Sequence, residues 1–465
     1  MSKYKTLIKD TVIFAIGSIG SKAIVFLLVP LYTNVLSSAE YGTADLVLTF
    51  SQLLMPIVCL SIYNSIVRFG LEHRNNPEST LLAGIVVWLI GCLALLILMP
   101  IINMYTAIAS WKWYLYFHVN SSILLTISQN YLKVKNENFK YSLISILNTA
   151  LLAGLNILLL VVLKIGVKGY LLSNVLACLI SAIVALLAGN IIQDLRHAKF
   201  DKKLLGNMLK YSIPLILNNI AWWIIQSSDK IMIEAYVGAA ALGLYTVATR
   251  LPSLINVVVS VFQEAWNISS IVEMDSSNDT RFYTNVFQVY TVGIFFVCII
   301  INAIIKPFMK IYVGAEFYLA WKLVPLLVVS AAAFSAVAAF YGAMYGALKK
   351  SVNNMLTTLG AGIINIVMNM IFIHYYGALG AVIGTMISYF VLAMLRMIDV
   401  NRFVKIKINF INYTLNCILL IVDAILITND IQVYLTSVIT LCLFVMLNWK
   451  NIQMWIYKCK GILKR

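Results

Sequence analysis

The sequence has few charged residues: Asp, Glu, Lys and Arg together make up 11% of its 465 residues. A soluble domain usually carries about 25% charged residues, so this chain lacks the side chains needed for a water-facing surface. Hydrophobic residues make up 62% of it, and a helix of about 20 apolar residues crosses a bilayer. The composition therefore excludes an ordinary soluble domain and indicates a protein whose apolar surface is covered by lipid.

The sequence also lacks the motifs of disulfide frameworks, metal sites and common enzymes. Its seven cysteines include no C-x-x-C pair, and six of them lie in apolar runs, where cysteine is typically a small packing residue. The four histidines are dispersed, and neither H-E-x-x-H, G-x-S-x-G nor the nucleotide-binding G-x-x-x-x-G-K-[ST] occurs. We therefore expect no enzyme activity, no metal and no cofactor.

The charge that is present is strongly basic, with a net value of +16. In a soluble protein this value would suggest a nucleic-acid partner. Here the basic residues lie in short gaps between long apolar runs, which is the topology signal of membrane proteins. Basic loops also favour the anionic cytoplasmic leaflet. The pattern argues against nucleic acid and predicts contacts with membrane lipids.

The long apolar runs predict an all-α polytopic membrane protein, because backbone groups in lipid must be hydrogen-bonded within their own segment. We expect about 14 transmembrane helices, and the first is too long to be the apolar part of a signal peptide. The predicted spans are 11–33, 43–66, 80–104, 113–133, 142–163, 169–190, 211–234, 241–263, 284–305, 320–342, 352–374, 378–398, 410–428 and 431–449.

The placement of positive charge predicts that both termini are cytoplasmic. With the N-terminus inside, 25 of the 34 Lys and Arg residues fall in inner segments and five in outer loops. The stretch 193–210 is the most basic internal segment, and it separates six predicted helices from eight. We interpret it as a cytoplasmic linker.

Weak internal repeats relate the two halves of the chain. Residues 36–42, between the first two predicted helices, match 237–243, and the stretch 156–169 matches 369–380 in the same order. An even number of helices in each half makes this a parallel repeat. We therefore predict four parts, listed here by residue number: an N-terminal six-helix bundle (1–192), the basic linker (193–210), a C-terminal six-helix bundle (211–400), and two additional helices with a basic tail (401–465).

Charged residues inside the apolar runs need an explanation, because a charge at the centre of a membrane helix costs about 2.5–3.5 kcal/mol on insertion scales. Lys22 lies in the middle of the first predicted helix and Arg250 near the middle of the eighth. We interpret both as cations of a central cavity, with structural pairing to a carboxylate as the alternative. Asp229 could neutralise either of them or couple transport to an ion. Lys230 is also a candidate for coupling or charge pairing, or it could extend to the outer surface.

Other polar residues allow less definite expectations. Asp45 and Arg68 flank the second predicted helix and are expected at the membrane interface, whereas Asp423, outside the repeated twelve helices, has no expected role. Uncharged polar residues gather in the fourth and seventh predicted helices, where they could form interhelical hydrogen bonds or line a hydrated cavity. They are Asn120, Gln129, Asn130, Asn218, Asn219, Gln226, Ser227 and Ser228.

Three stretches of the chain resemble a known family. They are PLYTNVLSSAEYG at 30–42 with Arg68 and Phe69 farther on, SDKIMI at 228–233 followed by GLY at 243–245 and RLP at 250–252, and GALGA at 377–381. With these stretches the chain resembles the polysaccharide flippases of the multidrug/oligosaccharidyl-lipid/polysaccharide exporter superfamily over nearly its whole length. The second stretch is the most specific of the three.

The resemblance implies two six-helix bundles around a central cavity, two C-terminal helices, and alternating access for a lipid-linked oligosaccharide. It also implies that Lys22 and Arg250 act against the diphosphate of the carrier lipid. The expected function is a flippase for undecaprenyl-diphosphate-linked repeat units of O-antigen, capsule or exopolysaccharide in a bacterial cytoplasmic membrane. A polysaccharide polymerase and glycosyltransferases are candidate partners, and the coupling ion, H⁺ or Na⁺, stays open.

Three alternatives remain beside this expectation: a lipid II flippase, a cation-coupled multidrug or small-solute antiporter, and a membrane scaffold for polysaccharide enzymes. The related multidrug extruders usually carry a functional carboxylate in the first-half bundle. This chain has Lys22 in its first helix instead, which argues against drug efflux. The charges inside the membrane argue against the scaffold, which has no use for them.

Overall fold

The computed structural model describes residues 20, 23–72, 77–276 and 280–462 of the chain. Within these ranges all regular structure is helical and no β-strand occurs. The chain divides into two compact units, residues 1–231 and 232–465. The boundary lies within a single long helix, α12 (Lys202–Val237). The predicted all-α polytopic fold is confirmed.

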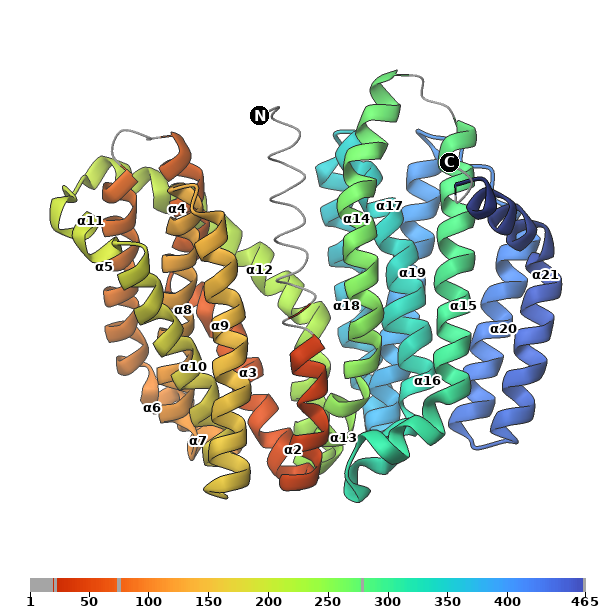
Figure 1. The fold of residues 1–465 in the computed structure, drawn as a ribbon, viewed down its shortest axis with the longest axis horizontal. Helices are drawn as coiled ribbons and strands as arrows, with labels where there is room; N and C mark the ends of the chain where they lie inside the picture. The colour runs from red at the N-terminus through yellow and green to blue at the C-terminus, as the bar shows by residue number, and fades with distance from the viewer. Residues whose placement is uncertain (1–19, 21–22, 73–76, 277–279, 463–465) are drawn as a thin grey trace. The chain divides into compact units, whose positions relative to one another are not determined.

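The first unit is built from antiparallel helices that pack around α8 (Lys112–Val134), which contacts α3, α4, α5, α9 and α10 (Figure 1). The helices of this unit, besides α8 and the first part of α12, are α2 (Val29–Val35), α3 (Ser38–Val58), α4 (Ile62–Glu72), α5 (Pro77–Ile97), α6 (Met99–Ile102), α7 (Thr106–Ala109), α9 (Asn138–Asn156) with its π-helical extension η1 (Ile157–Val162), α10 (Val167–Ala188) and α11 (Ile191–His197).

A break divides α3 from α4, although the sequence predicts one span over 43–66. α3 starts with a capping box, in which Ser37 and Glu40 each bond the other's backbone N–H. Pro56 lies inside α3 and supplies no N–H to the helical ladder. Leu60 and Ser61 then adopt left-handed backbone angles, with φ of 50° and 52°. The prediction of one continuous helix is therefore wrong at this point.

The second unit packs around the continuous helical segment Val324–Ala347, which is formed by α16, η3 and α17. Of the most apolar 18 residues of this segment, 83% are buried. Trp266 and Phe340 stack in its core with ring centroids 4.4 Å apart. The elements of this unit are α13 (Ala239–Ala248), α14 (Arg250–Ser276), α15 (Thr280–Tyr312), the 3₁₀ helix η2 (Ala315–Lys322), α16 (Val324–Leu327), the π-helix η3 (Val328–Phe334), α17 (Ser335–Ala347), α18 (Ser351–Tyr376), α19 (Ala378–Asn401), α20 (Phe410–Thr428) and α21 (Val433–Ile462).

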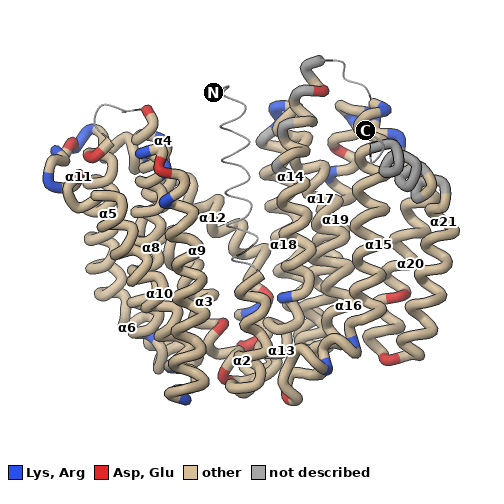
Figure 2. The backbone as a smooth tube through the Cα atoms, in the orientation of Figure 1, with Lys and Arg blue, Asp and Glu red and all other residues tan. Residues whose placement is uncertain are grey.

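Ten helices among the described residues are long and apolar enough to cross a membrane, and each overlaps one of the predicted spans. The spans 11–33 and 431–449 overlap shorter apolar helices at Ala23–Val35 and Val433–Trp449. The spans 113–133 and 211–234 coincide with α8 and α12, which are long but more polar. Figure 2 shows that the middles of the helices carry few charges. The total of about 14 spans stays a prediction.

Candidate functional site

The structure describes one of the two cavity cations predicted from the sequence, Arg250, but not the other. Lys22 lies outside the described residues. Arg250 is half-buried and opens α14, directly after α13 ends at Ala248. Pro252 explains this interruption of the predicted span 241–263, because it cannot donate to the carbonyl of Ala248. Arg250 therefore lies at a break in an apolar segment rather than in an unbroken helix.

Asp229 and Lys230 lie near the end of α12. Asp229 is 6% exposed, and its Oδ1 accepts a hydrogen bond from the backbone N–H of Lys230 at 2.9 Å. The Nζ of Lys230 lies 2.7 Å from Oδ2 of Asp45 on α3, and the Asp45 side chain is 7% exposed. Lys230 and Asp45 thus form a part-buried ion pair, which is the charge pairing considered for Lys230, and the depths of both residues in the membrane stay predictions.

This ion pair is one of five polar contacts between described residues that join α12 to α3, α4 and the turn between them. The contacts are Ser65 Oγ to Met208 O (2.8 Å), Asn219 Nδ2 to Ser61 Oγ (3.1 Å) and to Tyr63 Oη (3.3 Å), Trp223 Nε1 to Thr49 O (3.0 Å) and Lys230 Nζ to Asp45 Oδ2 (2.7 Å). The four α12 residues are eleven, four and seven positions apart, so they share one helical face. Their partners come in reverse order, and α12 therefore runs antiparallel to α3 and α4.

The polar residues of α8 form hydrogen bonds to neighbouring helices. Asn120 accepts from the thiol of Cys92 on α5 at 2.8 Å. Gln129 donates to Ser145 on α9 at 3.0 Å, and Asn130 donates to the carbonyl of Tyr63 on α4 at 2.9 Å. Of the two interpretations open from the sequence, interhelical bonding describes these three side chains.

The structure also reveals a buried cation that was not among the candidates from the sequence. Arg396, on α19, is 5% exposed. Its guanidinium donates to the Ala338 carbonyl (2.8 Å), Asn354 Oδ1 (2.7 Å) and Thr358 Oγ1 (2.8 Å), with a longer contact to Thr357. All of these acceptors are neutral. The signal in the sequence was an arginine in the last turn of the span 378–398, opposite polar residues at helical spacing in 352–374.

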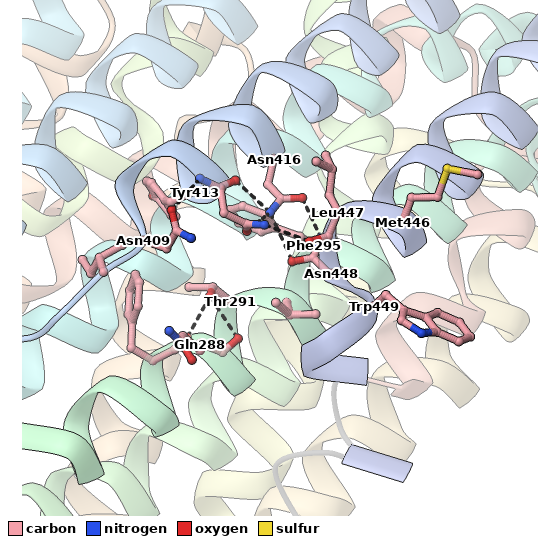
Figure 3. Close-up of a pocket in the computed structure, with 14 residues that line it drawn as sticks. Gln288, Thr291, Phe295, Asn409, Tyr413, Asn416, Met446, Leu447, Asn448 and Trp449 are labelled. Carbon is pink, nitrogen blue, oxygen red and sulfur yellow. Dashed lines mark hydrogen bonds between the residues drawn. The ribbon is translucent and has the colours of Figure 1, made fainter. Parts of the chain in front are cut away.

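A pocket of about 540 Å³ lies between α15, α20 and α21, and Figure 3 shows the side chains of Asn416 and Asn448 pointing toward each other in its wall. Five amide side chains line it, together with Thr291, Tyr413 and apolar residues, and none of its lining residues is charged. The amides are those of Gln288, Asn409, Asn412, Asn416 and Asn448. Such a lining suits water and neutral hydroxyl groups better than ions.

Two of these amides link α20 to α21. Nδ2 of Asn448 donates to Oδ1 of Asn416 at 2.8 Å, and Nδ2 of Asn416 donates to Oδ1 of Asn448 at 3.2 Å. Asn412 adds a bond from its Nδ2 to the carbonyl of Leu447 at 2.9 Å. A further hydrogen bond from an amide joins α15 to α20: Nδ2 of Asn302 on α15 donates to Oδ2 of Asp423 on α20 at 3.1 Å.

A family model described as "Polysaccharide biosynthesis protein" matches residues 7–267. The chain belongs to this family. A relative of this polysaccharide biosynthesis protein in Haemophilus influenzae, the Lsg locus putative protein 1, is 24% identical over 267 residues. That match covers 55% of this chain and 64% of the relative, which is less than two thirds of the relative's length.

Solved transporter structures share the fold of the polysaccharide biosynthesis protein. The lipid II flippase MurJ in its inward closed conformation matches with a TM-score of 0.72 and 15% identity, over 95% of this chain and 99% of that one. An inward-facing MATE family transporter of the MOP superfamily matches with a TM-score of 0.66 and 15% identity, over 82% and 93%. A MOP superfamily transporter from Pyrococcus furiosus matches with a TM-score of 0.60 and 14% identity, over 84% and 94%. The resemblance noted from the sequence is confirmed.

Proposed function

We propose that this polysaccharide biosynthesis protein is a flippase and not an enzyme. It moves an undecaprenyl-diphosphate-linked oligosaccharide repeat unit from the cytoplasmic to the outer leaflet of a bacterial cytoplasmic membrane by alternating access, with both of its termini in the cytoplasm. The product feeds the synthesis of O-antigen, capsule or exopolysaccharide. The match to the polysaccharide biosynthesis family over residues 7–267 carries the proposal.

The chemistry of the cargo assigns a role to the cations. A diphosphate loses hydration when it enters a low-dielectric cavity, and fixed cations replace part of that hydration with stronger effect as the dielectric falls. In the proposal Lys22 and Arg250 supply these cations. Arginine suits the task because its guanidinium stays charged and can bind two phosphate oxygens at once. The half-buried position of Arg250 at the junction of α13 and α14 is compatible with this role.

The neighbouring charges have a supporting role in the proposal. Lys230 is paired with Asp45 and so fastens the end of α12 to α3. Asp229 is the adjacent residue and is buried, and in the proposal it balances a cation of the cavity or responds to a coupling ion. Neither residue contacts the diphosphate in this scheme.

Reconstituted flipping of a labelled lipid-linked oligosaccharide tests the proposal. Loss of one charge-assisted hydrogen bond removes about 1.5–3 kcal/mol, so Lys22→Gln and Arg250→Gln should each slow flipping about tenfold or more. Lys22→Arg should retain more activity than Lys22→Gln, and Arg250→Lys should be intermediate. Lys112→Gln is the matched control, since Lys112 bonds Asn103 in an exposed position and should leave the rate unchanged.

Two outcomes would contradict parts of the proposal. Full recovery of flipping when Asp229→Asn is added to Lys22→Gln or Arg250→Gln would show that the cation is only a structural partner of Asp229. Faster flipping of lipid II than of the lipid-linked oligosaccharide would favour the second candidate function, a lipid II flippase. The similarity of the fold to that of MurJ is the reason to test this candidate. Efflux of organic cations without lipid flipping would identify an antiporter instead.

A further inference from the structure

The proposed transport function needs a driving force, and a buried carboxyl group on α20 is placed to supply one. The Asp423 side chain is 1% exposed. It accepts hydrogen bonds from Asn302 Nδ2 at 3.1 Å and from the hydroxyl of Thr440 on α21. Oδ1 of Asp423 and Oδ1 of Asn302 both make no hydrogen bond to any described residue. No cation of the described chain forms an ion pair with Asp423.

This arrangement fits a carboxylic acid better than a carboxylate. An unpaired ionised carboxylate away from water loses at least several kcal/mol of hydration, and its two hydrogen-bond donors, an amide and a hydroxyl, are neutral and supply no opposite charge to offset that loss. A protonated carboxyl carries an O–H donor, and the unpartnered Oδ1 of Asn302 is an acceptor on the amide that already binds it. Acid and amide can then satisfy each other through two hydrogen bonds.

A polar face of α20 leads from this carboxyl toward both ends of the helix. Asn412, Asn416 and Asp423 are four and seven positions apart within α20, a spacing that keeps them on one side, and Asn409 and Asp430 lie just beyond its two ends. Asn416, in the wall of the pocket, is two helical turns or about 10 Å from Asp423. The pocket has room for several waters, each of which occupies about 30 Å³. At the other end, Asp430 is paired with Lys306 of α15.

The helices around α20 bring few other titratable groups toward Asp423. α16 and η3 carry none, and the charged residues of η2, Glu316 and Lys322, are exposed. The remaining candidates include Cys298 and Lys306 on α15, Cys442 on α21, Tyr413 and Cys417 on α20 itself, and Asp430 just beyond its end. Lys306 and Asp430 form an ion pair and neutralise each other. Asp423 has no such partner among the described residues, so binding a proton is the way in which its charge can be neutralised.

We propose that Asp423 is a proton-binding site that couples cargo movement to a proton gradient. A proton from water at the Asp430 end of α20 converts the carboxylate to the acid, which bonds Asn302. Release of the proton to water in the pocket at the Asn416 end restores the carboxylate. The carboxylate is the less stable state in this buried setting, so a rearrangement of the helices must expose it to water. The inference rests on the proposed transport function, but the site can be measured without cargo.

Infrared spectroscopy of the protein in lipid nanodiscs tests the site directly. The wild type should show the carbonyl stretch of a buried protonated carboxyl at neutral pH, and the band should disappear in Asp423→Asn. It should persist in the control Glu72→Gln, because Glu72 is an exposed partner of Arg68. Absence of the band in the wild type would overturn the proposal, as would a band that responds to Na⁺ at fixed pH, which would indicate a metal-cation site.

Flipping in proteoliposomes then tests the coupling. An imposed pH gradient should accelerate flipping by the wild type, and Asp423→Asn should flip at the same rate with and without the gradient. Asn302→Ala should weaken the response to the gradient and shift the infrared band, since the carboxyl loses its amide partner. Full gradient stimulation of Asp423→Asn would refute the coupling. Failure of the wild type to flip any lipid-linked glycan would count against the proposed function and leave the infrared result standing.

Discussion

The contact between Gly342 and Arg396 allows the sharpest test of the second unit. A Cβ added at Gly342 would lie 2.5 Å from Nη1 of Arg396, whereas ordinary contacts begin at 3.4 Å. The end of an arginine side chain can usually move aside. Here the guanidinium is held by the carbonyl of Ala338 and by side chains of α18, so it cannot move without lengthening those bonds.

The expected cost of Gly342→Ala follows from three terms. Overpacking costs about 1–3 kcal/mol, and weakening one hydrogen bond from a charged group costs part of its 1.5–3 kcal/mol. Replacing glycine by alanine inside a helix returns about 0.5–1 kcal/mol. The substitution should therefore destabilise the protein by about 1–2 kcal/mol.

The same substitution should change sign when the guanidinium is absent. In an Arg396→Met background the Cβ no longer meets Nη1, so Gly342→Ala should stabilise by about 0.5–1 kcal/mol. The double-mutant cycle should show a coupling of about 2 kcal/mol, measured by equilibrium unfolding in mixed micelles. Gly346→Ala is the matched control, because a Cβ there meets nothing within 4 Å. Equal effects of Gly342→Ala in the two backgrounds would refute the packing argument.

Two further predictions concern topology and the extra helices. Reporters placed after Lys199 and after Gly461 should both be on the cytoplasmic side in fusion assays, and an external reading at either position would contradict the proposed orientation. Asn416→Leu should lower the free energy of unfolding by about 1–3 kcal/mol, because it leaves the buried amide of Asn448 without its reciprocal partner. Adding Asn448→Leu should recover most of that loss, and a double variant less stable than either single variant would contradict the pairing.

Helix positions could be predicted from the sequence because lipid requires long apolar runs to be helical. The predicted span 410–428 coincides with α20 (Phe410–Thr428), and 169–190 is close to α10 (Val167–Ala188). The interruptions were harder, because the apolar runs continue through them. Pro56 and Pro252 were the available signals, yet a proline can also be accommodated in a membrane helix.

The partners of the polar residues could not be predicted from periodicity. Lys230 and Asp45 are 185 positions apart, and nothing local to either residue indicates the other. Asp423 stood out in the sequence as a charge in an apolar run, but its meaning depends on Asn302, which is 121 positions away on another helix. Spacing indicates which side chains share a face, whereas tertiary packing decides what that face meets.

The amide bridge between α20 and α21 has a consequence for how the protein is made. α20 carries Asn412, Asn416 and Asp423 within one apolar segment, and each of these lowers its tendency to partition alone from the translocon into lipid. Only four residues separate it from α21. The two segments should therefore enter the bilayer together as a helical hairpin, with Asn416 and Asn448 paired, before Asp423 reaches Asn302 on the earlier helix α15. A later stretch of the chain would then supply the partner for a polar side chain on a helix that was inserted before it.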